Sequence, residues 1–568
     1  IRLPMAHRMA NARVTLTEGT GFADGEWEQT ERTVLVANLI RGARINLSDG
    51  TVKAKGSVEP TATVPARVGD EWRAIVVPQT VAAGTTLFTI TVGGIPYKFS
   101  KNEAFTYTAG KMSNFTIRVD KKAETGQYTL TLVNESITPW ESDLVSHDAE
   151  GKAYIVINTT RGHLKSSIIA ANKDYTKLKN LKITGEIDAT DFEFMKNEMT
   201  QLEALNLKDV KVYGRFGNQE WNGISDNVEK EGVIPVGAMS DKKSLLYLVL
   251  PDKLEGIGSS AFDNCTNLTG SLIIPKGVTR IGTMAFDNCS NMKGVLELPN
   301  TLEYISNQAF NYCDFTCELI LPESLKYIGH DAFLGNNGFY GNLNLPSDLF
   351  YLGSGAFQDC SNLTGDLRIP QKITEILNNT FKTTNFNGSL TLHDGITKIG
   401  NLAFMGTKFR GELILPKNLT IIGEEAFYNC NLSGELKLPN SILSIGNEAF
   451  SYNERLTGIL ELPNKISTIG DFAFSGCSGL QGLIIPRNVE SIRQGAFLNC
   501  FGIGSIVCEG DIPPYLGSGA FDGVPKDNFT VEVPESAVPQ YQTAIGWNEF
   551  KRIAAHHELV CRPSTVCA

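Results

Sequence analysis

The chain has 568 residues, of which 42% are hydrophobic and 20% charged, and its formal net charge is −11. A length above the ~100–200 residues of one domain predicts several domains or a repeat array, and the apolar content excludes a disordered chain. The excess of acidic side chains repels phosphate, so no nucleic-acid partner is expected. The sequence has no run of about 18 apolar residues that would predict a membrane-spanning helix.

Residues 1–140 alternate apolar and polar side chains over short runs, which is typical of strands that bury one face. Gly, Asn, Asp and Pro separate these runs, and no segment of useful length has a helical period. The pattern predicts an all-β, antiparallel sandwich. The expected strands are 12–17, 33–39, 72–77, 87–92, 115–119 and 128–132.

Residues 141–152 (ESDLVSHDAEGK) are acidic and lack a strand pattern, so we expect a linker there. Residues 153–212 follow with unevenly spaced leucines and isoleucines and one expected helix at about 190–200. The first coil of a repeat array often departs from the repeat, because it has to cover the exposed end of the core. The segment is therefore predicted to cap the N-terminal end of the array.

A fixed period of 23–24 residues fills residues 213–510. Phenylalanine recurs at this spacing from Phe262 to Phe521, Ala precedes all but one of them, and Met239 fits one step earlier. Leu/Ile-x-Leu/Ile-Pro segments and Ile-Gly pairs, such as Ile257-Gly258, recur in step with it. Three aligned series predict a solenoid, because one repeat cannot bury both of its faces unless neighbours stack on it.

Each series predicts one part of a coil. Leu-x-Leu is expected to be a short strand that ends at Pro, which has no N–H to donate. Ile-Gly is expected to be a second extended piece and a tight bend in which Gly has a positive φ. Ala-Phe is expected to be a short helical turn that places the ring in the core. The result is a curved or straight rod of short strands and short helical turns.

Seven of the eleven cysteines lie three residues after a phenylalanine of this series. Other coils have Asn or Thr at the same position, for example Asn336 and Thr384. A position that accepts Cys or a small polar residue is typical of packing in a core, so we expect buried free thiols and no disulfide framework.

Residues 511–553 are predicted to form the last coil and a C-terminal cap, in which a helix with aromatic side chains covers the last strand. Residues 554–568 form a tail that holds four residues of zinc-ligand type, His556, His557, Cys561 and Cys567. We expect a mobile extension beyond the cap, and no metal site is predicted.

Motifs of catalysis and cofactor binding are absent from the sequence. It has no Gly-x-x-x-x-Gly-Lys-Ser/Thr, Gly-x-Gly-x-x-Gly or Gly-x-Ser-x-Gly segment, and its seven histidines are scattered. We therefore expect no enzyme, no catalytic residues and no cofactor.

Three successive coils carry Tyr304, Tyr327 and Tyr351 at one position, with Phe350 beside the last. Other coils have varied residues there, which is typical of an exposed position. Exposed tyrosines supply rigid, amphipathic contact area, so these four residues are candidates for binding a partner. Stacking between neighbouring coils would also explain the tyrosines, and this alternative stays open.

Residues 153–553 resemble the BspA-type leucine-rich repeat family of bacterial surface proteins. The motif is Leu-x-Ile/Leu-Pro-x-x-Val/Ile-x-x-Ile-Gly-x-x-Ala-Phe-x-x-Cys-x-x-Leu, nearly intact from Leu272 to Leu296. The resemblance implies a leucine-rich repeat solenoid, export, and binding of host or bacterial surface proteins. It transfers no catalytic or ligand-contact residue.

Residues 1–140 resemble the fimbrillin-like (Mfa-like) domains of Bacteroidales fimbriae and surface lipoproteins. The resemblance is carried by phrases such as 74–80 (AIVVPQT), 105–111 (FTYTAGK) and 137–140 (ITPW). It implies attachment to the outer membrane, or entry into a pilus by accepting a strand from a neighbouring subunit. The chain starts at Ile1, so we expect a processed or trimmed product, and a lipid-bearing Cys upstream would provide the anchor.

Together these features predict a cell-surface adhesin whose leucine-rich repeat rod recognises proteins. Two alternatives stay open. One is a structural pilus or surface-layer subunit in which the solenoid is a spacer, and the other is an accessory glycan-binding protein.

Overall fold

The chain divides into two compact units, Ile1–His147 and Asp148–Ala568, in a computed structural model. The predicted linker at 141–152 and residues 557–568 of the tail lie outside the described residues. The structure describes residues 10–23, 26–30, 32–39, 43–45, 52–54, 61–63, 66–68, 71–76, 79–92, 95–108, 111–122, 128–139, 154–217, 220–221, 224–225 and 228–556.

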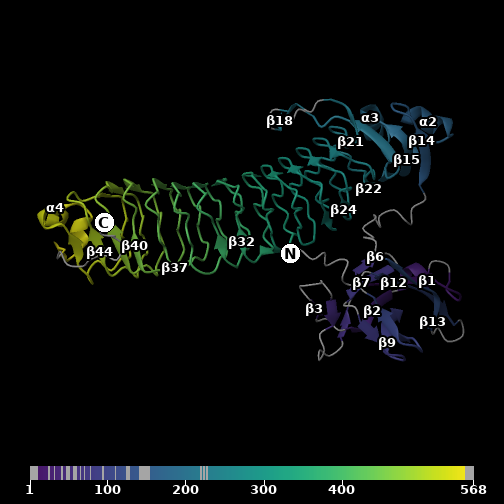
Figure 1. Ribbon diagram of the computed structural model, residues 1–568, viewed down its shortest axis with the longest axis horizontal. Helices are drawn as coiled ribbons and strands as arrows, with labels where there is room; N and C mark the ends of the chain where they lie inside the picture. The colour runs from purple at the N-terminus through teal and green to yellow at the C-terminus, as the bar shows by residue number, and fades with distance from the viewer. Residues whose placement is uncertain are drawn as a thin grey trace. The chain divides into compact units, whose positions relative to one another are not determined.

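The first unit is a β-sandwich (Figure 1). One sheet consists of β13 (Tyr128–Pro139), β12 (Lys111–Lys121), β1 (Ala10–Glu18), β7 (Glu71–Val76) and β6 (Ala66–Val68), in this order. The other consists of β10 (Ile95–Ser100), β9 (Thr86–Val92), β2 (Arg32–Leu39) and β5 (Thr61–Thr63). Smaller elements are the pair β8 (Gln79–Val81) and β11 (Phe105–Tyr107), the pair β3 (Ala43–Ile45) and β4 (Val52–Ala54), and α1 (Glu26–Gln29).

Both sheets contribute to one core in this unit. Alternate residues of β2 and β9, such as Val36 and Ile90, are buried together with Val14 of β1. The rings of Phe88 and Phe115, one from each sheet, meet edge to face at 4.8 Å. The predicted sandwich is thereby confirmed, with one difference: β1 pairs with β12 in parallel, whereas the other pairings of the two sheets are antiparallel.

The second unit begins with a sheet and two helices. Its sheet contains β14 (Ile155–Thr159), β15 (Asn180–Ile187), β16 (Ala204–Asn206), β17 (Val210–Gly214), β20 (Lys230–Glu231) and β22 (Tyr247–Val249). The helix expected at about 190–200 is α3 (Ala189–Asn197), which Asp188 and Asp191 begin with a capping box. The short helix α2 (Leu164–Ala170) was not predicted, because no side chain of its own sequence caps it.

The buried carboxylate of Asp191 joins the two helices. It accepts hydrogen bonds from the backbone N–H groups of Leu164 at 2.9 Å, Gly162 at 2.8 Å and Asp188 at 3.1 Å. The start of α2 is therefore capped by a residue that lies 27 positions later in the chain.

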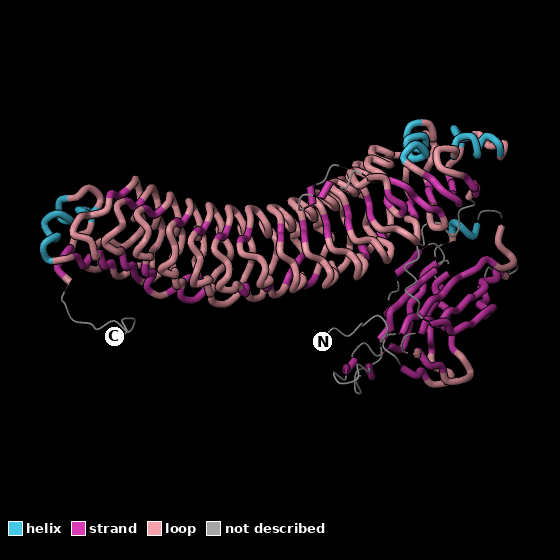
Figure 2. The backbone as a smooth tube through the Cα atoms, turned by 45° about the horizontal axis from the view of Figure 1, so that its top comes forward, coloured by secondary structure: helices cyan, strands magenta, loops and turns pink. Residues whose placement is uncertain are grey.

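From residue 233 onward the unit is a regular, gently curved solenoid (Figures 1 and 2). The Ile-Gly segments, and the equivalent segments of the coils that have other residues there, form parallel two-residue strands that we call the Ile-Gly strands. They are β21 (Val233–Ile234), β23 (Gly256–Ile257), β25 (Arg280–Ile281), β27 (Tyr304–Ile305), β28 (Tyr327–Ile328), β30 (Tyr351–Leu352), β33 (Glu375–Ile376), β35 (Lys398–Ile399), β36 (Ile421–Ile422), β38 (Ser444–Ile445), β41 (Thr468–Ile469), β43 (Ser491–Ile492) and β45 (Tyr515–Leu516).

The Leu-x-Leu segments form a second, less continuous series of strands. They are β24 (Leu272–Ile273), β26 (Leu296–Glu297), β32 (Leu367–Arg368), β34 (Leu390–Thr391), β40 (Ile459–Glu461), β42 (Gly482–Ile485), β44 (Ile506–Cys508) and β46 (Val531–Val533). Further short strands are β18 (Glu220–Trp221), β19 (Ile224–Ser225), β29 (Gly341–Asn342), β31 (Leu363–Thr364), β37 (Ser433–Glu435) and β39 (Arg455–Thr457). At the C-terminal end lie α4 (Val538–Thr543), a short 3₁₀ turn at Trp547–Glu549 and β47 (Ile553–Ala555).

The phenylalanine series forms a continuous stack through the core. Rings of successive coils from Phe262 to Phe521 lie 5.1–6.0 Å apart and within 16° of parallel. Each ring is almost completely buried, which contributes roughly 1.5–3 kcal/mol of transfer free energy. The predicted solenoid is confirmed.

The side chain at the cysteine position has to be small and also has to donate a hydrogen bond. The Cys289 thiol donates to the carbonyl of Phe262 in the preceding coil at 3.2 Å, and five further coils repeat this bond from Cys to the preceding Phe. In coils with Asn instead, the Nδ2 of Asn336 donates to the carbonyl of Phe310 at 2.7 Å. The nine cysteines among the described residues are all buried and free, as expected.

The Ala-Phe segment is not helical, which corrects the expected short helical turn. Residues before and after each Phe have left-handed backbones, for example Ser260 with φ +50° and Asn264 with φ +57°. The N–H of Cys265 closes a tight turn on the carbonyl of Phe262 at 3.2 Å, while the N–H of Phe262 donates to Ala285 in the next coil at 2.8 Å. The segment is therefore a series of β-turns that also bond to the neighbouring coil.

The glycine of the Ile-Gly pair does not have a positive φ, so that expectation was wrong. A Cβ atom at Gly423 would lie 2.5 Å from the backbone nitrogen of Asn401 and 2.6 Å from the carbonyl carbon of Gly400. The same crowding against backbone recurs at the equivalent glycines of other coils, such as Gly446. Glycine is needed because two backbones approach closely there.

Replacing Gly423 by Ala is expected to lower the free energy of unfolding by about 1–3 kcal/mol, because backbone atoms have to move. The measurement is denaturant-induced unfolding followed by circular dichroism. Gly504→Ala is the matched control, since the nearest heavy atom to a Cβ there is the Gln481 carbonyl oxygen at 3.9 Å. Equal effects of the two substitutions would contradict the close-approach explanation.

Candidate binding surface

The predicted tyrosines lie side by side on three consecutive Ile-Gly strands. Tyr304 of β27 pairs in register with Tyr327 of β28, which pairs with Tyr351 of β30. The next residue on each strand, Ile305, Ile328 or Leu352, is buried in the core. Because side chains alternate along a strand, the tyrosines lie on the opposite, outer face.

The three rings lie in one row, in which two rings stack and the third is tilted. Tyr327 and Tyr351 have ring centroids 4.5 Å apart and planes 6° from parallel. Tyr304 and Tyr327 are 6.3 Å apart and tilted by 40°. The three tyrosines are half-buried, whereas Phe350 beside them is 42% exposed. We call the four residues the aromatic stripe. Tyr327 and Tyr351 stack between coils, as the alternative interpretation of the sequence predicts, and the stripe is partly exposed. Binding of a partner there stays a prediction.

His330 holds the Tyr351 end of the stripe in place. Its Nδ1 accepts a hydrogen bond from the backbone N–H of Ser354 at 3.0 Å, and its Nε2 lies 3.0 Å from the Tyr351 hydroxyl oxygen. An acceptor at Nδ1 implies a proton at Nε2, so the imidazole donates to the phenol. In other coils the same backbone contact is made by an asparagine, for example from Asn401 to the N–H of Glu424.

Burial and the neighbouring ring raise the pKa of Tyr327. Removal from water is the main cause, and the Tyr351 phenol adds to it, so that the pKa of Tyr327 rises to about 12. Burial also raises the pKa of Tyr351. Both hydroxyl groups are therefore neutral at physiological pH and able to donate hydrogen bonds.

Charged side chains flank the aromatic stripe on its N-terminal side. The guanidinium of Arg280 lies over the Tyr304 ring, 5.7 Å from its centroid. Lys326 and Glu303, each next to a tyrosine of the stripe, form an ion pair at 2.7 Å between adjacent coils. The stripe thus combines an apolar stack with a cation and a paired carboxylate at its edge.

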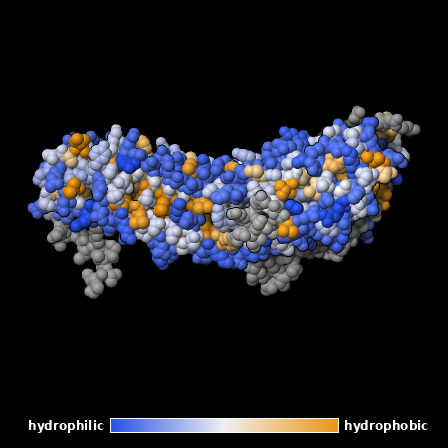
Figure 3. Space-filling model, turned by 90° about the horizontal axis from the view of Figure 1, so that it is seen from above, coloured by the Kyte–Doolittle hydropathy of each residue, from blue (hydrophilic) through white to orange (hydrophobic). Residues whose placement is uncertain are grey.

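Several other apolar side chains of the described residues are also exposed. On the face drawn in Figure 3, apolar side chains lie in small separate patches within a mostly hydrophilic surface. Ile320, Ile414 and Ile459 are more than half exposed. They belong to three coils that are separated from one another by other coils. Single exposed residues of this kind are common on protein surfaces.

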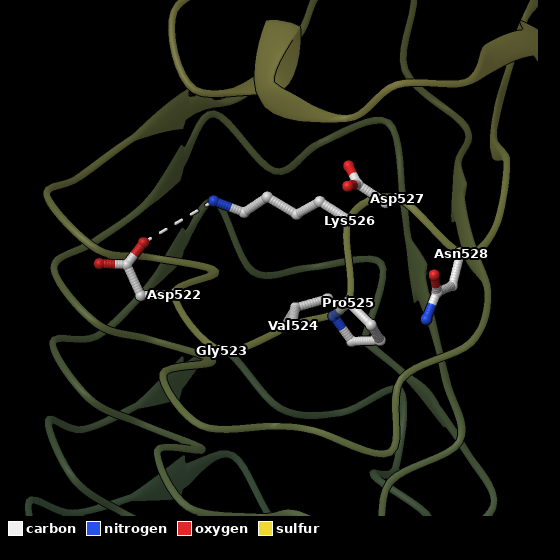
Figure 4. Close-up of a pocket in the computed structure, with 7 residues that line it drawn as sticks. All are labelled: Asp522, Gly523, Val524, Pro525, Lys526, Asp527 and Asn528. Atoms are coloured by element: carbon white, nitrogen blue, oxygen red, sulfur yellow. Dashed lines mark ion pairs between the residues drawn. The ribbon is translucent and has the colours of Figure 1, made fainter.

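A pocket of about 470 Å³ near the C-terminal end is lined by one loop, Asp522–Asn528 (Figure 4). Its cation, Lys526, is already paired with Asp522 at 3.7 Å and with Glu549. Because one short loop forms the walls and the ammonium group is neutralised, this pocket is a weaker candidate than the stripe.

A second pocket, of about 350 Å³, was missed by the sequence analysis. It is lined by Tyr428, Asn429, Asn431, Tyr452, Glu454 and Arg455. The two tyrosines occupy different positions of successive coils, one and two residues after the phenylalanine, so no single series contains them both. The sequence signal for this pocket is a pair of aromatic residues that follow the phenylalanine by one or two positions in two neighbouring coils.

Within the residues that the structure describes, no group of three or more His, Cys, Asp or Glu side chains could hold a metal ion. Of the four tail residues of zinc-ligand type, only His556 is described. Across the described helices, none is both long enough and apolar enough to cross a membrane.

The raised pKa of Tyr327 predicts a pH dependence. The unfolded chain releases this proton near pH 10, so the free energy of unfolding falls as pH rises from 10 to about 12. Ultraviolet difference absorption between the native protein and the variant Tyr327→Phe should show one phenol with a midpoint near 12. A midpoint near 10 would contradict the burial described for this ring.

Comparison with known proteins gives two family matches and several structural neighbours. The family model described as BspA type leucine rich repeat region matches residues 233–364, 294–410 and 397–526, and the fimbrillin-like model matches residues 1–140. No curated protein matches the chain.

The solved structures that resemble the chain are distant. A leucine-rich repeat protein from Bacteroides ovatus is 23% identical, with a TM-score of 0.42, covering 59% of this chain and 90% of that one. A leucine rich cell surface protein from Faecalibacterium prausnitzii is 19% identical, with a TM-score of 0.32 and coverages of 64% and 85%. A candidate cell adhesion protein from Bacteroides uniformis is 16% identical, with a TM-score of 0.19 and coverages of 24% and 51%.

These identities are too low to transfer a function, and the assignment depends on the family models. The repeat model covers more than half of the chain, on the coils whose phenylalanine stack and Ile-Gly strands are described above. The two family matches together indicate a protein of the cell surface with a role in protein binding. The chain belongs to the BspA-type leucine-rich repeat family and carries a fimbrillin-like region at residues 1–140.

Proposed function

We propose that this protein is an adhesin that binds a host or bacterial surface protein through the aromatic stripe of its solenoid. The observation that carries the proposal is the in-register row of Tyr304, Tyr327 and Tyr351 with the exposed ring of Phe350 beside it. No catalytic step is part of the proposal.

Preorganisation supports this role. The parallel strand pairing fixes the backbones of the three tyrosines, and the Tyr327–Tyr351 stack and the His330 hydrogen bond fix the rings of Tyr327 and Tyr351. Binding therefore immobilises few additional rotamers, which lowers the entropic cost of association. Tyrosine is also enriched among residues that dominate interface energies.

The flanking groups add polarity and charge to the stripe. The neutral phenols donate hydrogen bonds, while Arg280 and the Lys326–Glu303 pair present both signs of charge at the edge. Charges at an interface rim contribute to specificity and association rate more than to affinity. The stripe therefore fits a partner protein whose contact surface has an apolar centre and a polar rim.

The test is binding of the labelled full-length protein to cultured epithelial cells. Binding is expected to saturate and to disappear after protease treatment of the cells. Replacing Tyr304, Tyr327 and Tyr351 together by Ala should lower the affinity by about tenfold or more, because aromatic anchors are removed. Phe350→Ala, at an exposed ring, should lower the affinity without affecting the fold.

The matched control replaces Ser444, Thr468 and Ser491 by Ala at the same strand position of three other coils. This variant should bind like the native protein. Thermal unfolding of both triple variants separates loss of binding from loss of fold. Native affinity in the tyrosine variant would remove the stripe as the binding site.

A second candidate is a pilus or surface-layer subunit in which the solenoid is a spacer. The fimbrillin-like match over residues 1–140, in which the described strands form a sandwich with its own core, favours this function. It predicts that the purified protein assembles into polymers visible by electron microscopy and light scattering. A strictly monomeric protein at all concentrations tested would argue against it.

A further inference from the structure

The second pocket of the solenoid contains a fixed pair of aromatic rings. Tyr428 and Tyr452 come from successive coils, with ring centroids 5.3 Å apart and planes at 69°. Tyr452 is 51% exposed and has a left-handed backbone with φ +58°. A bulky residue in this conformation costs roughly 1–2 kcal/mol, and the same position is Asn in the preceding coil, at Asn429. The ring lies over Gly476 of the next coil, where a Cβ atom would be 3.3 Å from Tyr452 Cδ1.

Polar side chains with unused hydrogen-bonding capacity surround these rings. Asn429, Asn431, Glu454 and Arg455 line the pocket of about 350 Å³. Within the described part of the chain, none of these four side chains forms a hydrogen bond or an ion pair. Together they offer amide donors and acceptors, a carboxylate and a guanidinium fork beside an aromatic surface.

The backbone below the pocket is rigid. Asn453 is fully buried, and its Nδ2 donates to the carbonyls of Phe427 at 2.7 Å and Phe450 at 2.9 Å. Its Oδ1 accepts from the N–H groups of Cys430 at 3.2 Å and Leu432 at 3.0 Å, on either side of Asn431. One buried amide thus holds the segments that carry both tyrosines, so the pocket is preformed.

The charges around the pocket favour a neutral ligand. Burial and the carboxylates of Glu425 and Glu424 raise the pKa of Glu448, and Glu425 and Glu448 also lie near Tyr428. This negative field repels an anionic ligand. Inside the pocket Glu454 and Arg455 carry opposite charges, so the lining itself favours neither an anion nor a cation.

We propose that the Tyr428–Tyr452 pocket binds a neutral saccharide. A pyranose presents a face of C–H groups that packs on an aromatic ring, and neighbouring hydroxyl groups that bond to carboxylate, guanidinium and amide groups. The pocket supplies each of these partners and falls within the size range of small-ligand sites. This site uses no residue of the aromatic stripe and is independent of protein binding there.

The test is isothermal titration calorimetry of the full-length protein with maltose, lactose and N,N′-diacetylchitobiose at millimolar concentrations. At least one of them should bind with a stoichiometry near one. The variant Tyr452→Asn should lower the affinity by about tenfold or more, because it removes one ring. It should not lower the thermal stability, because Asn suits a left-handed backbone better than Tyr.

Tyr312→Asn is the matched control. Tyr312 occupies the same position of another coil, with φ +49° and 53% exposure, and its ring likewise lies over a glycine, Gly335. The position that corresponds to Tyr428 holds Asp287 there, so the second ring is missing. This variant should bind the saccharide like the native protein.

Several outcomes would overturn the proposal. These are no binding of any of the three disaccharides, native affinity in Tyr452→Asn, an equal loss in Tyr312→Asn, or binding of sialyllactose in preference to lactose. The triple tyrosine variant of the stripe should retain saccharide binding. The triple tyrosine variant should therefore lose cell binding only, and Tyr452→Asn should lose saccharide binding, so failure of one proposal can be told from failure of the other.

Discussion

The stacking of each coil on the next is the constraint on which the rest of the solenoid depends. Backbone N–H groups inside the turns donate to the following coil, as from Phe427 to Ala449 at 2.8 Å. Every position then faces its own equivalent in the next coil, as the phenylalanine rings do at centroid distances of 5.1–6.0 Å. Only side chains that pack well against themselves fit the inner positions, which explains the phenylalanine stack, the Cys or Asn donors and the glycines without room for a Cβ atom.

The same constraint applies to charges on the outside. Unlike charges follow each other at the coil spacing in the pairs Lys372–Asp348 and Lys417–Asp394, at 2.7 and 2.6 Å. Exposed pairs of this kind contribute little individually, about 0–1 kcal/mol. Where like charges face each other the effect is visible: burial and Asp263 raise the pKa of Asp287 to about 6.

Surface recognition arises where variable positions of neighbouring coils coincide. The aromatic stripe repeats one position over three coils, whereas the Tyr428–Tyr452 pocket joins two different positions of two coils. The continuous core provides the stability, so outer positions tolerate a strained residue such as Tyr452. Because neighbouring coils lie close together, side chains far apart in the sequence form a binding surface that exists before a ligand arrives.

The sequence alone determined the two-part architecture, the period, the phenylalanine core and the membership of Tyr304, Tyr327 and Tyr351 in one row, because in a solenoid the period itself defines which residues are neighbours. It did not determine the left-handed turns or the close backbone approach that requires glycine after the Ile-Gly strands. It also did not show that Tyr327 stacks closely on Tyr351 while Tyr304 is tilted away. Those features depend on backbone dihedrals and side-chain contacts that differ between coils of the same period. The pocket of Tyr428 and Tyr452 was decided only in three dimensions, because its residues occupy different positions in the repeat.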